Sequence, residues 1–136
     1  MIDRHAAVRR YWAEIWTNGR FDLAEQFYAP VYRENLEATT PAEFAAAAAA
    51  WRAHFSDFRV DLHELFDAGN RVITRVTYRA THTGDFKALP ARGRSIETTG
   101  IDIFEFEGDH VVQHWHETDH LVLFRQLGAE LRPGSD

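Results

Sequence analysis

The stretch FRVDLHELF at residues 58–66 marks the change in pattern that decides the fold. Phe58, Val60 and Leu62 alternate with polar residues there, which is the two-residue period of a half-buried strand. Earlier in the chain the apolar residues are spaced three and four apart, as on one face of an amphipathic helix. The sequence therefore predicts helices before residue 56 and strands after it, with a slip in phase at residues 64–66 that is typical of a β-bulge.

Three helices are expected in the first part of the chain. The first covers residues 6–16, and a short second one covers residues 22–28, where Pro30 then takes the chain out of helical geometry. The third is predicted at residues 40–55, since Thr40 can cap it, the following proline suits the first helical position and Glu43 can complete a capping box. The apolar stripe of the first helix consists of Val8, Tyr11, Trp12, Ile15 and Trp16.

After residue 66 the alternation predicts three further strands, at residues 71–82, 95–107 and 110–119, followed by a short helix at residues 121–127. Helices first and strands afterwards indicate an α+β fold in which the N-terminal helices pack on a strongly curved antiparallel sheet. A sheet that curls over helices leaves a concave cavity, and such cavities commonly bind small molecules.

Length and composition limit the possible functions. The 136 residues suffice for one hydrophobic core, which we expect in a single domain at residues 1–130, followed by a polar tail at residues 131–136. A net charge of -6 argues against nucleic acid as a partner, and the absence of cysteine excludes disulfides and thiolate chemistry. The longest apolar run, residues 44–51, is too short to span a membrane, and no signal peptide is visible, so we expect a cytoplasmic protein.

Residues 110–120 hold the densest group of chemically active side chains, with four of the eight histidines and two carboxylates. Strand alternation places Trp115, Glu117 and Asp119 on one face, and His114 and His116 on the other. If the Trp115 face lines the cavity, desolvation raises the pKa of Asp119 towards the range of a useful base.

Each of these features also has a plain structural interpretation. The pair His114 and His116 could bind a metal, with His120 as a third ligand, but without a defined third ligand the motif is weak and we expect no metal. Asp119 could simply cap the helix that follows it. Trp115, like Trp12 and Tyr11, could be core packing, since aromatic stripes usually are.

Four segments, at residues 81–86, 89–94, 99–104 and 114–119, resemble those of the SnoaL-like polyketide cyclases of the NTF2-like superfamily. The resemblance extends over nearly the whole chain, from the helix with Tyr11 and Trp12 to Gly128. It implies an NTF2-like cone-shaped barrel, a homodimer or homotetramer built on the sheet, and a pocket that works without a metal or organic cofactor. The best-known members close a polycyclic aromatic ring by an intramolecular aldol condensation.

The resemblance also suggests roles for individual residues. The family's acid/base aspartate in the last strand falls on Asp119, and a polar residue that follows the second helix falls on Asn35, with Tyr32 close by in the same segment. Two residues before the aspartate, where the characterised cyclases usually have histidine, this chain has Glu117. A second carboxylate there would raise the pKa of Asp119 further and remove a neutral hydrogen-bond donor. His82 lies on the core-directed face of its strand by alternation.

The family resemblance, together with Asp119, implies a cofactor-independent cyclase or isomerase. Asp119 would remove a proton next to a carbonyl group, while Asn35 and His82 would stabilise the enolate oxygen. The expected substrate is a small hydrophobic or aromatic, polyketide-like molecule held against Trp115 and Trp12. Two alternatives stay open, namely a non-catalytic protein that binds a small molecule and another cofactor-free lyase or hydrolase on the same fold.

Overall fold

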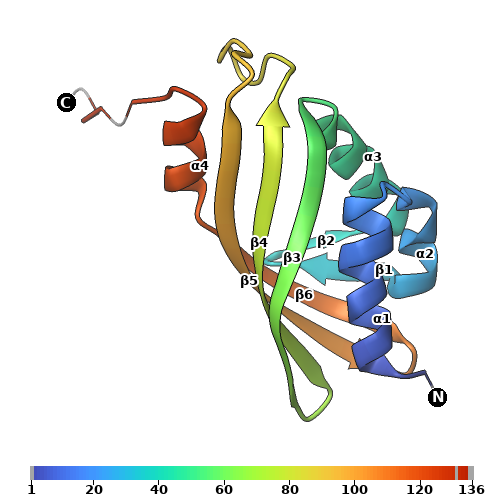
Figure 1. Cartoon of the computed structure of the whole chain (residues 1–136). Helices are drawn as coiled ribbons and strands as arrows, with labels where there is room; N and C mark the ends of the chain where they lie inside the picture. The colour runs from blue at the N-terminus through green and yellow to red at the C-terminus, as the bar shows by residue number, and fades with distance from the viewer. Residues whose placement is uncertain (1, 131, 135–136) are drawn as a thin grey trace.

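The computed structural model of the chain describes residues 2–130 and 132–134, and it has the predicted α+β architecture. Short helices cover one side of a curved sheet, and a last helix packs near the far end of the long strands (Figure 1). Of the predicted tail at 131–136, residues 131, 135 and 136 lie outside the described residues. Within the described part of the chain, no helix is long and apolar enough to cross a membrane.

The helices that begin at Arg4, Pro41 and His120 each follow a side-chain cap. Asp3 accepts a hydrogen bond from the backbone N–H of Ala6 at the start of the first helix, and Thr40 accepts one from that of Glu43, which confirms the predicted cap. The segments are α1 (Arg4–Arg10), a π-helix η1 (Tyr11–Thr17), a 3-10 turn η2 (Phe21–Leu23), α2 (Ala24–Phe27), α3 (Pro41–Arg52) and α4 (His120–Gln126).

The π-helix η1 sets the direction of the aromatic side chains in the first helical segment. Its end has the wider hydrogen-bond spacing of a π-helix, because the backbone N–H of Asn18 donates to the carbonyl of Ala13 at 3.1 Å. The Thr17 hydroxyl donates to the carbonyl of Trp12 at 3.0 Å and accepts from the backbone N–H of Val60 at 3.1 Å. This side chain therefore ties η1 to the neighbouring long strand.

The six strands form one mixed sheet in the order β2-β1-β6-β5-β4-β3. They are β1 (Tyr28–Glu34), β2 (Glu37–Thr39), β3 (Phe55–Ala68), β4 (Arg71–His82), β5 (Ser95–Glu107) and β6 (His110–Thr118). All neighbours are antiparallel except β1 and β6, which run parallel, because the chain that leaves α2 enters the sheet as a strand beside β6. The sheet curves without closing, with β2 and β3 at its two edges (Figure 1).

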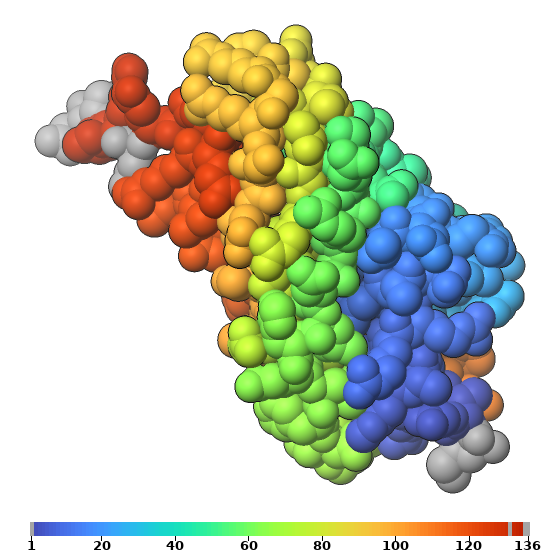
Figure 2. Space-filling model, viewed as in Figure 1, coloured from blue at the N-terminus to red at the C-terminus, as the bar shows by residue number. Residues whose placement is uncertain are grey.

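One of the irregularities in strand pairing lies where the sequence predicted a bulge, and the others, such as the shift between Glu105 and Phe106, were not predicted. The register of β3 against β4 shifts between Leu62 and Glu64, at the predicted bulge. In the space-filling view, the blue helical segment lies directly against the green strand β3 (Figure 2). A bulge bends the strand that carries it, so the bulge in β3 helps to wrap the sheet around the helices.

The core consists of two clusters of buried side chains. One lies between the helices and the sheet and contains Tyr11, Trp12 and Phe104, and the other lies below α4 and contains Phe55 and Leu123. Trp16 and Tyr78 pack against both clusters. The cavity described next lies where the two clusters meet.

Candidate active site

A cavity of about 190 Å³ lies between η1 and the inner face of the sheet. Its apolar wall includes Trp12, Trp16, Trp51, Phe58 and Leu123. Its polar lining includes Asp102, His114, His116, Thr118 and Tyr78. The apolar lining is therefore suited to an aromatic ring, and the polar lining can form hydrogen bonds with a ligand and exchange protons with it.

The hairpin of β5 and β6 brings the polar groups together. Asp102 pairs with His116, and Phe104 pairs with His114, in the register of the two strands. Since alternate residues of a strand point to the same face, all four side chains project from the inner face of the sheet. The turn between the strands thus fixes which carboxylate meets which imidazole.

Asp102 and His114 form a buried pair. The distance between Asp102 Oδ2 and His114 Nε2 is 2.6 Å, and both side chains are 2% exposed. The imidazole ring stacks on Phe104 with the ring centres 4.2 Å apart. Packing therefore holds the imidazole in one orientation, with its Nε2 directed at the carboxylate.

A chain of hydrogen bonds continues from the other ring nitrogen. His114 Nδ1 is 2.9 Å from the hydroxyl of Tyr28, which donates to the hydroxyl of Tyr11 at 3.1 Å. The indole N–H of Trp16 donates to the same Tyr11 oxygen at 2.9 Å. Burial is the main cause that raises the pKa of both tyrosines well above its ordinary value, so both stay protonated.

The His114 ring connects Asp102 with the buried tyrosines. Its Nε2 faces the Asp102 carboxylate and its Nδ1 faces the Tyr28 hydroxyl, and the tautomer of the ring decides which nitrogen donates. The imidazole therefore links the buried carboxylate to the buried phenols in contacts shielded from water.

The second carboxylate oxygen of Asp102, Oδ1, is free to accept a hydrogen bond or a proton from a ligand. Oδ1 is buried and has no hydrogen-bond partner among the described residues, although Asp102 lines the cavity. An unpaired buried acceptor is costly, and native structures contain few of them. A ligand in the cavity that offers a proton or a donor to Oδ1 would remove this cost.

Two further titratable groups adjoin the pair. Glu34 Oε1 lies 3.7 Å from His114 Nδ1, and Glu34 also lines the cavity. Burial lowers the pKa of His116 below its ordinary value of 6.5, and the nearby His114 lowers it further. His116 is therefore neutral at pH 7 and can both donate and accept a hydrogen bond.

Comparison with known proteins assigns the family. The sequence model of the SnoaL-like polyketide cyclases matches residues 6–127. The chain belongs to this family.

Solved structures with the same fold span almost the whole chain. TsrD from Streptomyces laurentii is 30% identical, with a TM-score of 0.82, and the match covers 96% of this chain and 100% of that one. A protein from Acidithiobacillus ferrooxidans is 25% identical with a TM-score of 0.83, and 90% and 92% of the two chains are covered. A SnoaL-like polyketide cyclase from Agrobacterium tumefaciens, at 20% identity, shares the fold with a TM-score of 0.79 over 94% and 100% of the chains. The search of curated proteins finds no match.

Of the eight residues predicted for a SnoaL-like site, two line the cavity and six do not. Tyr11 and Trp12 line the cavity. Trp115 and Glu117 project from the other face of β6, where Trp115 pairs with Ile103 and is 40% exposed. The face predicted to line the cavity is thus the outer face of the sheet, because the inner side chains of β6 are His114, His116 and Thr118.

Asp119 lies just beyond the end of β6, where it caps α4. Its Oδ1 accepts a hydrogen bond from the backbone N–H of Val122 at 3.1 Å, and its backbone carbonyl accepts one from the Thr98 hydroxyl at 2.8 Å. Asp119 is not among the described residues that line the cavity, whereas its neighbour His120 is. Its carboxylate therefore has a structural task.

Asn35 completes the pairing of two strands. Its backbone N–H donates to the carbonyl of His114 at 2.9 Å, and its side-chain oxygen accepts the backbone N–H of His116 at 2.9 Å. Asn35 thus extends the parallel contact of β1 with β6 past the last residue of β1.

His82 and Tyr32 are buried outside the cavity lining. The His82 ring packs beside Phe55 at 5.6 Å, and Tyr32 stacks on Tyr28 at 3.9 Å. His82 Nε2 and the Tyr32 hydroxyl have no hydrogen-bond partner within the described part of the chain. Within the described part of the chain, neither side chain forms a hydrogen bond with Asp102 or His114.

The histidines of the cavity do not form a metal site with carboxylates. Both ring nitrogens of His114 already have hydrogen-bond partners. Among residues 2–130 and 132–134, no group of three or more histidine, aspartate, glutamate or cysteine side chains is arranged to hold a metal ion.

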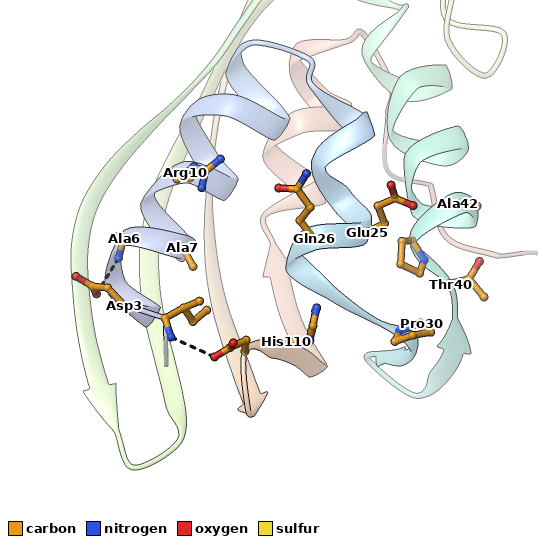
Figure 3. Close-up of a pocket in the computed structure, with 13 residues that line it drawn as sticks. Asp3, Ala6, Ala7, Arg10, Glu25, Gln26, Pro30, Thr40, Ala42 and His110 are labelled. Atoms are coloured by element: carbon orange, nitrogen blue, oxygen red, sulfur yellow. Dashed lines mark hydrogen bonds between the residues drawn. The ribbon is translucent and has the colours of Figure 1, made fainter.

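A larger hollow of about 1040 Å³ lies on the outside of the helical layer, where α1, α2 and the start of α3 meet (Figure 3). Its polar groups serve local structure, since Asp3 caps α1 and Asp109 accepts the backbone N–H of Ile2. Arg10 and Gln26 line its upper part (Figure 3). The buried acid–base pair lies in the smaller cavity, which we therefore take as the candidate active site.

Proposed function

We propose that the chain is a cofactor-independent polyketide cyclase that enolises a ketone and closes a ring by intramolecular aldol addition. The unpaired Oδ1 of buried Asp102, in a cavity with aromatic walls, is the observation that carries this proposal. Membership of the SnoaL-like family supports the reaction class. Asp102 is the base, and the hydrogen bond with His114 holds its carboxylate in place.

The reaction would begin with a proton transfer to Asp102. The C–H bond next to the substrate ketone breaks, its proton moves to Asp102 Oδ1, and the electron pair forms a C=C bond while the carbonyl oxygen takes the negative charge. The enolate carbon then attacks a second carbonyl of the same molecule, which forms the new C–C bond. The resulting alkoxide takes the proton back from Asp102, so no redox partner is needed.

The cavity limits what can bind. About 190 Å³ is below the range of roughly 300–1,000 Å³ that is common for ligand pockets. We infer that the reacting ring of a polyketide-like substrate enters and lies against Trp12 and Trp16. The rest of a longer molecule would stay outside the cavity.

The base can be tested without knowing the natural substrate. Solvent deuterium incorporation at the acidic C–H of small aromatic β-keto esters is measured for the wild type, Asp102→Asn and Asp119→Asn. We expect Asp102→Asn to slow exchange by about 10²- to 10⁴-fold and Asp119→Asn to retain it.

The same measurement decides between the alternatives. Loss of exchange in Asp119→Asn alone would show that the base is Asp119, as the family resemblance suggested. Binding of the esters without any exchange would favour a protein that only holds a small molecule.

We also propose that the protein self-associates through the outer face of the sheet. Ile101 is 54% exposed and Trp115 40% exposed on adjacent strands of that face. Apolar side chains grouped in this way are typical of contact surfaces. A homodimer is the simplest assembly that would cover them, and a homotetramer is the alternative.

A further inference from the structure

Tyr78 is a polar group of the cavity that the proposed mechanism has not yet used. It projects from the inner face of β4, next to the strand that carries Asp102. Tyr78 pairs with Thr98, and Val76 pairs with Gly100, so the tyrosine ring leans along β5 towards Gly100. It therefore lies on the same wall of the cavity as Asp102.

Gly100 makes this position possible. A Cβ atom at residue 100 would lie 2.9 Å from Tyr78 Cε2 and 3.1 Å from its hydroxyl oxygen. Contacts below 3.0 Å do not occur for real Cβ atoms, so any larger residue would push the ring away. The requirement is for space, because the strand is regular at this point.

The ring is fixed on its other sides by aromatic neighbours. Its centre is 6.0 Å from that of Trp12 and 6.2 Å from that of Phe58. Even so, Tyr78 is only partly buried, and it lines the cavity together with both of these residues. The hydroxyl is thus held in place beside the space in which a ligand would lie.

The hydroxyl is a donor at neutral pH. Burial raises the pKa of Tyr78 well above its ordinary value, and the charge of Asp102 raises it further. A hydrogen bond with the Thr118 side chain acts in the opposite direction. Tyr78 therefore keeps its proton while Asp102 Oδ1, which lines the same cavity, has no partner among the described residues.

We propose that Tyr78 donates the hydrogen bond that stabilises the enolate oxygen, and that Gly100 positions it for this role. The inference rests on the proposed function. As the C–H proton moves to Asp102 Oδ1 and the carbonyl π electrons move onto oxygen, the Tyr78 O–H donates to that oxygen and keeps its proton. A keto group and its neighbouring C–H would thus bridge Tyr78 and Asp102.

The kinetic test compares Tyr78→Phe, Gly100→Ala and the control Thr77→Val. The Thr77 hydroxyl bonds to His63, away from the cavity lining, so its loss tests only the general effect of altering β4. In the deuterium exchange assay, we expect Tyr78→Phe to lower kcat by about 100-fold with little change in KM. Gly100→Ala should lower kcat in the same sense, and Thr77→Val should leave it unchanged.

A binding test needs no turnover. In the Asp102→Asn background, which imitates the protonated base, 4-nitrophenolate serves as an analogue of the enolate and its absorbance reports the ionised form. We expect the added Tyr78→Phe substitution to weaken its binding by about 10-fold or more, since a hydrogen bond to a charged group is lost.

The two tests separate the two proposals. If Asp102→Asn stops exchange but Tyr78→Phe changes neither kcat nor phenolate affinity, the reaction stands and the role of Tyr78 is overturned. If the wild type shows no exchange, the proposed function fails, and the phenolate titration alone decides about Tyr78. If the Asp102→Asn variant does not bind 4-nitrophenolate, the proposed role of Tyr78 is also overturned.

Discussion

Replacing His114 by phenylalanine would show whether the buried pair serves stability or chemistry. The substitution keeps the stacking on Phe104 but leaves both oxygens of Asp102 without partners in the described core, since Oδ1 already lacks one. Removal of one partner from a buried pair is expected to destabilise the fold by about 3–5 kcal/mol. That is a large part of the roughly 5–15 kcal/mol that stabilises a domain.

Adding Asp102→Leu to His114→Phe should restore most of this stability. The second substitution removes the unpaired charge, so we expect the double variant to stay only about 1–2 kcal/mol below the wild type, because Tyr28 still lacks its bond to residue 114. Urea unfolding of both variants measures the difference. As a control, Glu105→Gln, on the same strand as Asp102, breaks a solvent-accessible ion pair with Arg71 of β4, with an expected effect below about 1 kcal/mol.

The reasoning is refuted if the double variant is as unstable as the single one, since the cost would then come from lost packing. A stable double variant without deuterium exchange would instead show that the pair is maintained for its acid–base chemistry.

Three further predictions follow from the geometry. Because burial lowers the pKa of His116, the unfolded chain binds protons first as the pH falls, so stability should decrease below about pH 6.5 and His116→Asn should flatten this part of a pH series of urea unfolding curves. Asp119→Ala should lower the free energy of unfolding by about 1 kcal/mol through loss of the cap on Val122, with deuterium exchange retained. Trp115→Glu should convert an assembly that uses the outer face into monomers in sedimentation velocity, and an unchanged sedimentation coefficient would contradict the proposed contact.

The sequence was most informative where a local pattern is coupled to a single structure. Thr40 followed by Pro41 and Glu43 specifies a helix start whatever the rest of the chain does, and the structure has that cap. The alternation after residue 56 likewise predicts strands, because a strand has only two faces.

Alternation alone could not decide which face of a strand points inward. In β6 both faces carry large side chains, with Trp115 on one and His114 on the other. In β5, Ile101 and Phe104 compete in the same way. The hairpin of β5 and β6 did contain a usable signal. Its register places His114 opposite Phe104, so the two residues must lie on the same face of the sheet, and the inward face of one strand fixes that of the other.

The parallel contact of β1 with β6 could not be predicted from local pattern. It joins segments such as Glu34 and His114, which lie far apart in the chain. This contact brings Tyr28 to His114, and so it creates the hydrogen-bond chain behind the candidate base. Sequence reasoning therefore did not single out Asp102, the base that we propose, since its partner is defined by tertiary structure.

The π-helix η1 makes the aromatic wall of the cavity depend on chain length as well as on residue type. Deleting one residue, such as Ala13, would allow the segment to return to an α-helix, because the wider π turn holds one extra residue. Trp12 and Trp16, which now share the cavity wall four residues apart, would then be three residues apart, and the spacing of the two indole rings along the wall would change. Point substitutions can adjust the size of this wall, but an insertion or deletion in residues 11–17 would replace it with another, so changes of ligand in relatives of this chain are best sought in the length of this segment.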